Sequence, residues 1–256
     1  MKKSGQVTIF IIIGIVVVAF AVLAYIFYPE IKTTLTGSSD NPSAFLQNCL
    51  EEKIENTISD LSLKGGSLNP EHYFVYDNSN IEYLCYTGNY YETCVVQQPM
   101  LKRHIESEIE KGIENEAQSC FDSLKLSFEN KGYNVELRKG AMKVELLPKR
   151  VVVTFNNSLT TSGQDSEEYD KFEVILNNNL YELVSIANSI LNWESQYGDS
   201  ETTIYMNYYH DLKVEKKKQS DGTTIYILTD RNNGNKFQFA SRSVAWPPGY
   251  GAGGVV

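Results

Sequence analysis

Four cysteines are the residues of this chain whose type and spacing indicate the most definite chemistry. Cys49 and Cys120 fall on the apolar stripes of two predicted helices, and Cys85 and Cys94 lie in the two predicted strands of a hairpin. An even number of cysteines in an exported chain indicates disulfides. Of the three possible pairings we favour Cys49–Cys120 between the helices and Cys85–Cys94 within a hairpin. Four free thiols, buried as small apolar side chains, are the alternative.

The remaining reactive side chains form no pattern typical of catalysis. His72, His104 and His210 are scattered and no CxxC pair exists, so neither a zinc site nor any other metal site is predicted. No nucleophile elbow, HExxH, phosphate loop or dinucleotide fingerprint is present, and we predict no catalytic residue and no cofactor. His104 falls on the polar side of a helical pattern and is expected to be solvated. The chain is predicted not to be an enzyme, although a site built from scattered residues is an alternative.

Two features favour a role in surface interaction. Asn156, Asn157 and Ser158 form an N-glycosylation sequon where a predicted strand gives way to a loop, so Asn156 is a candidate glycosylation site. The segment 72–94 is rich in tyrosine, which combines a large contact area with a polar tip. The simpler interpretation of these tyrosines is that they favour strands.

The first thirty residues carry the information about location. Residues 7–28 contain no charge, and as a helix they would be ~33 Å long, enough to cross a membrane. Lys2 and Lys3 precede them, which predicts a cytoplasmic N-terminus and an extracellular C-terminal part. The partner implied for residues 7–28 is membrane lipid. The alternative is a cleaved secretion signal ending at Ala24, although the apolar run is longer than is usual for one.

The stretch "KKSGQVTIF", followed by an Ile/Val run, resembles the start of archaeal type IV pilins and related membrane-anchored surface proteins. The resemblance covers about the first thirty residues. It implies cleavage between Gly5 and Gln6, with Thr8 at the position where that family carries Ser or Thr. Pilins of this kind carry a glutamate early in the stem, and Phe10 stands there instead. Uncharacterised archaeal membrane-anchored proteins with large ectodomains match the opening more closely than filament-forming pilins do.

Beyond residue 43 the patterns predict helices alternating with strands. The first helix is expected to begin at Asn41-Pro42-Ser43 and to continue to Leu61, and Gly65 and Gly66 are expected to end it. Two further helices are expected over 100–128 and 171–194. The predicted strands, several joined by Asn-Gly or Asp-Gly turns, are 73–76, 81–87, 90–96, 133–139, 142–148, 150–156, 202–210, 212–218, 223–230 and 236–241. Residues 156–170 are predicted to form a polar loop.

Together these patterns predict an α+β protein: an N-terminal transmembrane helix and an ectodomain of helices packed on antiparallel β-meanders. The expected regions are 1–6 cytoplasmic, 7–28 transmembrane, 29–43 linker, 44–156 and 157–242 helix-meander regions, and 243–256 a Gly/Pro tail. Beyond residue 28 the charge is 21 − 32 = −11, which excludes nucleic acid as a partner. We therefore predict a cell-surface structural or adhesion protein, or a pilin-like subunit that self-associates or binds a surface partner. An exported hydrolase-type enzyme or a ligand-binding ectodomain without a recognisable motif is the alternative.

Overall fold

A computed structural model describes residues 41–163 and 166–245 of the 256-residue chain. The described residues from Leu46 onward belong to one compact unit. The predicted transmembrane segment 7–28, the predicted processing residues Gly5 and Gln6, and the tail 246–256 lie outside the described residues. Within the described ranges, no helix has both the length and the apolar character needed to span a membrane.

The first described helix, α2 (Pro42–Ser62), begins and ends as its sequence predicts. The Asn41 side-chain oxygen accepts hydrogen bonds from the backbone N–H groups of Ser43 and Ala44, at 3.0 and 3.4 Å, so Asn41 caps the helix. After Ser62 the chain turns through Gly65 and Gly66. Both have positive φ angles, a conformation that costs glycine little.

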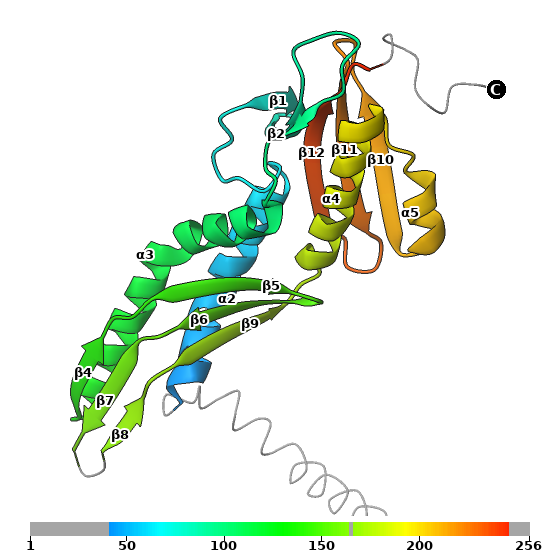
Figure 1. Cartoon of the computed structure of the whole chain (residues 1–256). Helices are drawn as coiled ribbons and strands as arrows, with labels where there is room; N and C mark the ends of the chain where they lie inside the picture. Colours follow the sequence, from blue (N-terminus) through cyan, green and yellow to red (C-terminus); the bar gives the residue numbers. More distant parts are fainter. Residues whose placement is uncertain (1–40, 164–165, 246–256) are drawn as a thin grey trace, which may run out of the picture. The chain divides into compact units, whose positions relative to one another are not determined.

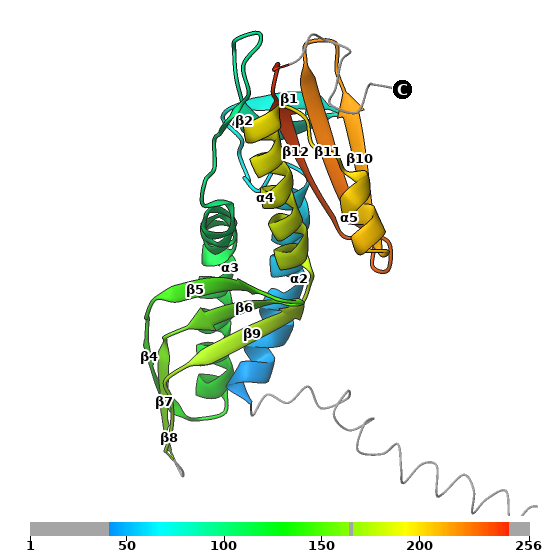
Figure 2. The same cartoon turned by 45° about the vertical axis from the view of Figure 1, so that its right-hand side comes forward.

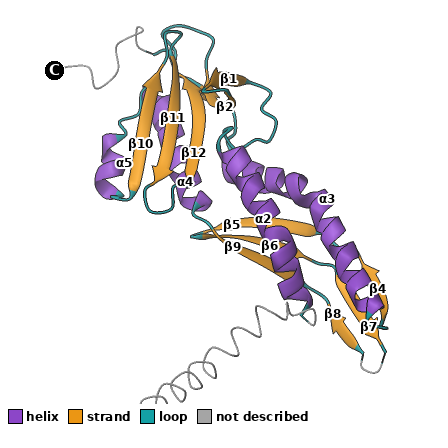
Figure 3. Cartoon of the chain, turned by 180° about the vertical axis from the view of Figure 1, so that it is seen from behind, coloured by secondary structure: helices purple, strands orange, loops and turns teal. Residues whose placement is uncertain are grey.

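The long helix α3 (Leu101–Asn130) buries one continuous stripe, in agreement with the predicted spacing. Its buried residues are Leu101, Ile105, Ile109, Ile113, Ala117, Cys120, Phe121, Leu124 and Phe128. Cys120 forms a disulfide with Cys49 of α2, with the two Cα atoms 6.1 Å apart. Figure 3 shows α2 and α3 side by side, and the bond therefore fastens the two helices together. The second disulfide joins Cys85 and Cys94, so both favoured pairings are present.

Two three-stranded antiparallel sheets lie along α3 (Figure 1). One has the order β4 (Asn134–Arg138), β7 (Ser158–Ser162), β8 (Glu167–Tyr169), and the other β5 (Met142–Leu147), β6 (Arg150–Phe155), β9 (Phe172–Asn177). The Phe121 ring of α3 meets the rings of Phe155 and Phe172 edge-on, at centroid distances of 5.3 and 5.4 Å. These apolar contacts fix the helix on the second sheet.

A six-stranded mixed sheet forms the rest of the core. Its order is β1 (Tyr73–Tyr76), β2 (Ser79–Tyr86), β12 (Lys236–Arg242), β11 (Thr223–Asp230), β10 (Leu212–Lys218), and β3 (Val95–Val96) also pairs with β2. Only β2 and β12 pair in parallel among these strands. Helix α4 (Leu180–Tyr197) packs on β12 and β11, and the short α5 (Thr203–Tyr208) lies beside β10 (Figure 2).

The structure corrects the predicted helix over 171–194. Residues 172–177 form strand β9, and the helix begins only at Leu180. Phe172, Val174 and Leu176 are buried while the residues between them are exposed, a two-residue period that fits pairing with β6. Phe172 and Leu176 also satisfy a helical spacing, and so the pattern alone favoured the wrong element.

Three further assignments were wrong. Residues 203–208 form helix α5 rather than a strand, and the alternation of Ile204, Met206 and Tyr208 corresponds to no buried face. The expected loop 156–170 contains β7 and β8, whose hydrogen bonds to each other and to β4 stabilise a polar sequence as strands. Of the expected strand 90–96 only Val95–Val96 pairs, because the disulfide and a turn occupy the rest.

The overall α+β class is confirmed, with both antiparallel and mixed sheets. The expected boundary between regions 44–156 and 157–242 does not coincide with a break in strand pairing. Strand β6 pairs with β9 across it, and β2 pairs with β12. Strands from both halves of the sequence therefore share the same sheets, an arrangement that hydrophobic periodicity does not report.

Candidate functional site

The glycosylation candidate Asn156 lies at an accessible point of the fold. It follows the last residue of β6, its side chain is exposed, and its backbone N–H donates to the Ala141 carbonyl at 3.0 Å. The next residue of the sequon, Asn157, is buried, and its Oδ1 accepts a 2.8 Å hydrogen bond from the Gly140 N–H. Glycosylation at Asn156 remains a prediction.

The tyrosine-rich segment serves two purposes. Tyr83 is buried, and its ring contacts those of His72 and Tyr86 at centroid distances of 4.7 and 5.0 Å, so part of the segment is core. Tyr90 and Tyr91, in the loop closed by the Cys85–Cys94 disulfide, are 62% and 75% exposed. The loop tip thus displays two aromatic side chains to solvent.

A serine, a glutamate and a histidine distant in sequence meet at the N-terminal end of α3. The Ser67 hydroxyl donates to Glu82 Oε2 and lies 2.7 Å from His104 Nε2. His104 is half-buried, so the expectation that it is solvated was wrong. Glu82 Oε1 accepts a further, longer hydrogen bond of 3.4 Å from Gln98.

The order of these three groups decides what they can do. In a nucleophilic triad the imidazole lies between the hydroxyl and the acid, and the acid orients the imidazole. Here the hydroxyl lies between the imidazole and the carboxylate, and Ser67 is only 5% exposed. The cluster ties the Gly65-Gly66 turn to β2 and α3, and we assign it a structural role.

Two adjoining cavities form a concave feature that we call the amide groove. The first, of about 640 Å³, lies between α2 and the turn joining β11 to β12, and the second, of about 900 Å³, lies between the start of α4 and α5. The two share Asn177, Asn178, Leu183 and Asn233. Asparagines from three parts of the sequence line them: Asn56, Asn177, Asn178, Asn179, Asn232, Asn233 and Asn235.

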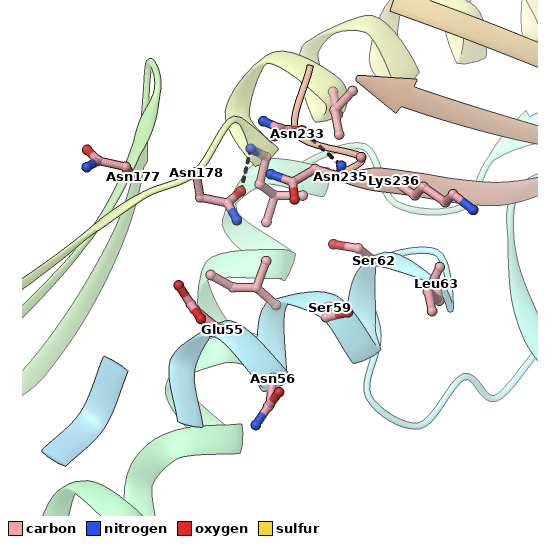
Figure 4. A pocket seen from close by; sticks show the side chains of 14 residues that line it. Glu55, Asn56, Ser59, Ser62, Leu63, Asn177, Asn178, Asn233, Asn235 and Lys236 are labelled. Atoms are coloured by element: carbon pink, nitrogen blue, oxygen red, sulfur yellow. Dashed lines mark hydrogen bonds between the residues drawn. The ribbon is translucent and has the colours of Figure 1, made fainter. Parts of the chain in front are cut away.

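Figure 4 shows how the first cavity is built. Asn178, Asn233 and Asn235 lie on one side, and Glu55, Ser59 and Ser62 rise from α2 on the facing side. Asn178 Oδ1 accepts a 2.8 Å hydrogen bond from the Leu180 N–H and so caps the first turn of α4. Because its oxygen is held in this way, the Asn178 amide NH₂ faces the cavity.

A chain of hydrogen bonds fixes the opposite orientation at Asn235. Asp230 Oδ2 can only accept, and it accepts from Asn179 Nδ2 at 2.6 Å. Asn179 Oδ1 is therefore the acceptor for Asn235 Nδ2, at 2.7 Å. That leaves Asn235 Oδ1 as an acceptor toward the cavity, with no hydrogen-bond partner among the described residues. The cavity thus contains one oriented donor and one oriented acceptor.

The second cavity adds a carboxylate and aromatic rings. Glu182 Oε1 accepts from the Lys149 N–H at 2.9 Å, while its Oε2 is buried and has no hydrogen-bond partner within the described ranges. Tyr181, Tyr205 and Tyr209 line the same cavity, and the Tyr205 hydroxyl is held 2.8 Å from that of Ser189. The exposed carboxylate of Asp211 also lines this cavity and is accessible to a ligand.

The wall of this groove offers hydrogen-bonding groups, and those of Asn178 and Asn235 are held in fixed orientations, an arrangement that can bind a polar ligand. No group of three or more His, Cys, Asp or Glu side chains that could hold a metal ion occurs in the described part of the chain.

Sequence reasoning missed the groove because its residues have other local roles. Asn232–Asn235 were interpreted only as a hairpin turn, and Asn177–Asn179 fell inside a predicted helix. Three consecutive asparagines are poor in a helix interior, since their side chains compete for backbone hydrogen bonds. That run could have indicated the helix start at Leu180, although not its proximity to the β11–β12 turn.

No protein-family model, no curated protein sequence and no solved structure matches this chain.

Proposed function

We propose that this chain is a membrane-anchored cell-surface protein whose ectodomain recognises a ligand, and that it serves adhesion or surface structure. The observation that carries the recognition role is the amide groove, where Asn178 presents a donor and Asn235 an acceptor into one cavity. A concave site with a few oriented polar groups is the usual form of a binding site.

The proposed location rests on the sequence of residues 7–28, which is uncharged and long enough to span a bilayer. The two disulfides support it, because such bonds persist in oxidising compartments and are rare in the cytosol. The orientation, with the C-terminal part outside, follows from Lys2 and Lys3.

The experiment is mass spectrometry of the native protein extracted from membranes, combined with protease treatment of intact cells. An anchored protein retains Met1 and loses its ectodomain to the protease. A chain starting at Tyr25 would overturn the anchor, and protection of the ectodomain in intact cells would overturn surface display.

A pilin-like filament subunit is the second candidate, favoured by the Gly5-Gln6 pair and the apolar stem that follows. In that case the native chain starts at Gln6, and electron microscopy of the cell surface shows filaments that antibodies to the ectodomain decorate. Phe10, which stands where that family carries glutamate, favours the solitary anchor.

A further inference from the structure

We propose that the amide groove binds a neutral oligosaccharide. This inference rests on the proposed recognition role and specifies its ligand, and it does not depend on the membrane location. Three observations carry it: the oriented amides, the tyrosine rings and the acidic charge of the groove.

Sugar hydroxyls both donate and accept hydrogen bonds, and the first cavity is organised for both. The Asn178 NH₂ is positioned to donate, and Asn235 Oδ1 to accept, in the same space. Neither amide can turn over without losing a bond to the backbone or to the Asp230 network. Because these polar groups are already held in place, binding does not have to pay the conformational entropy of ordering them.

The second cavity extends the site along the ligand. Asp211 lines this cavity and is exposed, and its carboxylate can accept hydrogen bonds from sugar hydroxyls. Tyr205 and Tyr209 lie in the same cavity, and Tyr209 is 48% exposed. Exposed tyrosine rings offer an apolar face for the C–H side of a pyranose ring and a polar tip for its hydroxyls.

The charges in the groove disfavour an anionic ligand. The first cavity is lined by one carboxylate and one lysine, Glu55 and Lys236, whereas the second is lined by Lys149 and three carboxylates, Glu182, Asp211 and Asp230. Because this surplus is negative and the ectodomain as a whole is acidic, an anionic ligand would be repelled.

The groove also lacks what an extended peptide needs. Strand addition requires an open sheet edge. β12 pairs with β11 along its whole length and with β2 at Ala240–Arg242. The nearby edge strand β9 has its backbone hydrogen-bonded by the Gln47 side chain. A saccharide, held by side chains alone, does not need a free strand edge.

The test is binding of maltohexaose, cellohexaose, mannohexaose and a wider neutral glycan array to the full-length protein. The protein is kept in a detergent without a sugar headgroup, and binding is followed by calorimetry and tyrosine fluorescence. Two variants separate recognition from folding. Asn178→Asp keeps the oxygen that caps Leu180 but replaces the inward NH₂ by a carboxylate oxygen, and Ser59→Trp fills the first cavity from an exposed position of α2.

We expect saturable binding of at least one neutral oligosaccharide. Loss of one hydrogen bond in Asn178→Asp weakens it about tenfold, and Ser59→Trp abolishes it, while both variants keep the wild-type melting temperature. Asn48→Ala, an exposed asparagine of the same helix outside the groove, serves as the control and binds as the wild type does.

No binding to any neutral glycan, or binding that both groove variants leave unchanged, would overturn the inference. Preferential binding of charged glycans or of peptides would also overturn it. If no neutral glycan binds but protease removes the ectodomain from intact cells, the proposal of saccharide binding is refuted and that of surface display stands. If a neutral glycan binds but cells retain the protein in the cytosol, only the proposal of surface display is refuted.

Discussion

The side chain of Gln47 pairs with the backbone of Ile175 as a neighbouring strand would. Gln47 Nε2 donates to the Ile175 carbonyl at 3.1 Å, and the Ile175 N–H donates to Gln47 Oε1 at 3.0 Å. Ile175 lies in β9, which pairs with β6 and, among the described strands, is an edge of its sheet. Exposed edges invite pairing with other chains, and this contact from α2 covers part of the edge.

The first prediction concerns this contact. Gln47→Ala removes two hydrogen bonds and leaves the Ile175 backbone open, and we expect a loss of about 1–2 kcal/mol in the free energy of unfolding. We also expect concentration-dependent self-association, because an uncovered strand edge is a template for pairing. Urea unfolding and sedimentation velocity measure the two effects. Asn48→Ala on the same helix should change neither, and a monomeric Gln47→Ala protein of wild-type stability would refute the role of the contact.

The second prediction concerns Glu194, a carboxyl that is only 2% exposed. It accepts hydrogen bonds from the Tyr226 hydroxyl, from the Ser200 N–H at 3.0 Å and from the Ser241 hydroxyl at 3.0 Å, with Lys216 and Asp199 as the nearby charges. Burial raises the pKa of Glu194 above its ordinary value of 4.5, against the lowering effect of the Tyr226 hydrogen bond and of Lys216.

The sign of the pH dependence follows from that raised pKa. Because the folded protein binds the Glu194 proton more tightly than the unfolded chain does, this group stabilises the fold most below pH 4.5. Its contribution is lost as the pH rises from 4.5 through the folded-state pKa. Glutamine does not titrate, so Glu194→Gln does not lose stability in this way as the pH rises. The melting temperature of Glu194→Gln, measured relative to that of the wild type by scanning calorimetry, should therefore rise between pH 4.5 and 8.

Glu201→Gln is a matched control of opposite sign. The hydroxyl and N–H of Thr203 hold the pKa of Glu201 below its ordinary value. Its contribution is therefore present above pH 4.5 and lost as the pH falls through the folded pKa, so Glu201→Gln should lose stability relative to wild type as the pH rises. Parallel pH profiles for the wild type and Glu194→Gln would contradict the assignment to Glu194.

The third prediction compares the two disulfides. Cys49–Cys120 closes a separation of 71 residues and Cys85–Cys94 one of 9. If their main effect is to restrict the unfolded chain, they contribute ~4.4 and ~2.6 kcal/mol respectively. The double substitution Cys49→Ala/Cys120→Ala should thus lower the free energy of unfolding more than Cys85→Ala/Cys94→Ala does. Urea unfolding of both variants measures this, and the reverse order would show that strain or residual structure outweighs chain entropy.

The cysteine pairs and the elements of the fold differ in how far sequence could predict them. The α3 stripe from Ile105 to Leu124 and the cysteines on it followed from helical spacing, since a long periodic segment has only one face to bury. The prediction of a helix over Phe172–Leu176 was wrong because so short an apolar pattern fits both the helical and the strand period. Pairing with β6 makes this segment a strand. The amide groove depends on the β11–β12 turn lying beside the start of α4, a tertiary contact that no local pattern encodes.

The last prediction tests the hydrogen-bond chain that orients the groove. In Asp230→Asn the new Oδ1 can keep the 2.8 Å bond from the Asn232 N–H, so its Nδ2 must then donate to Asn179. The side-chain amides of Asn179 and Asn235 would both flip, exchanging their oxygen and NH₂ positions. Asn235 would then present its NH₂ group to the cavity instead of its oxygen.

We expect this reversal to weaken neutral oligosaccharide binding about tenfold, the effect of one mismatched hydrogen bond, with little change in stability. NMR of the Asn235 side-chain amide would show its protons protected in the wild type and exchanging quickly in Asp230→Asn. Asp221→Asn is the matched control, because Asp221 holds the β10–β11 turn through Thr223 in the same way but lies outside the groove. If Asp230→Asn binds as the wild type does while its Asn235 amide is reversed, Asn235 does not contact the ligand, and the acceptor in the first cavity must be sought at Glu55 instead.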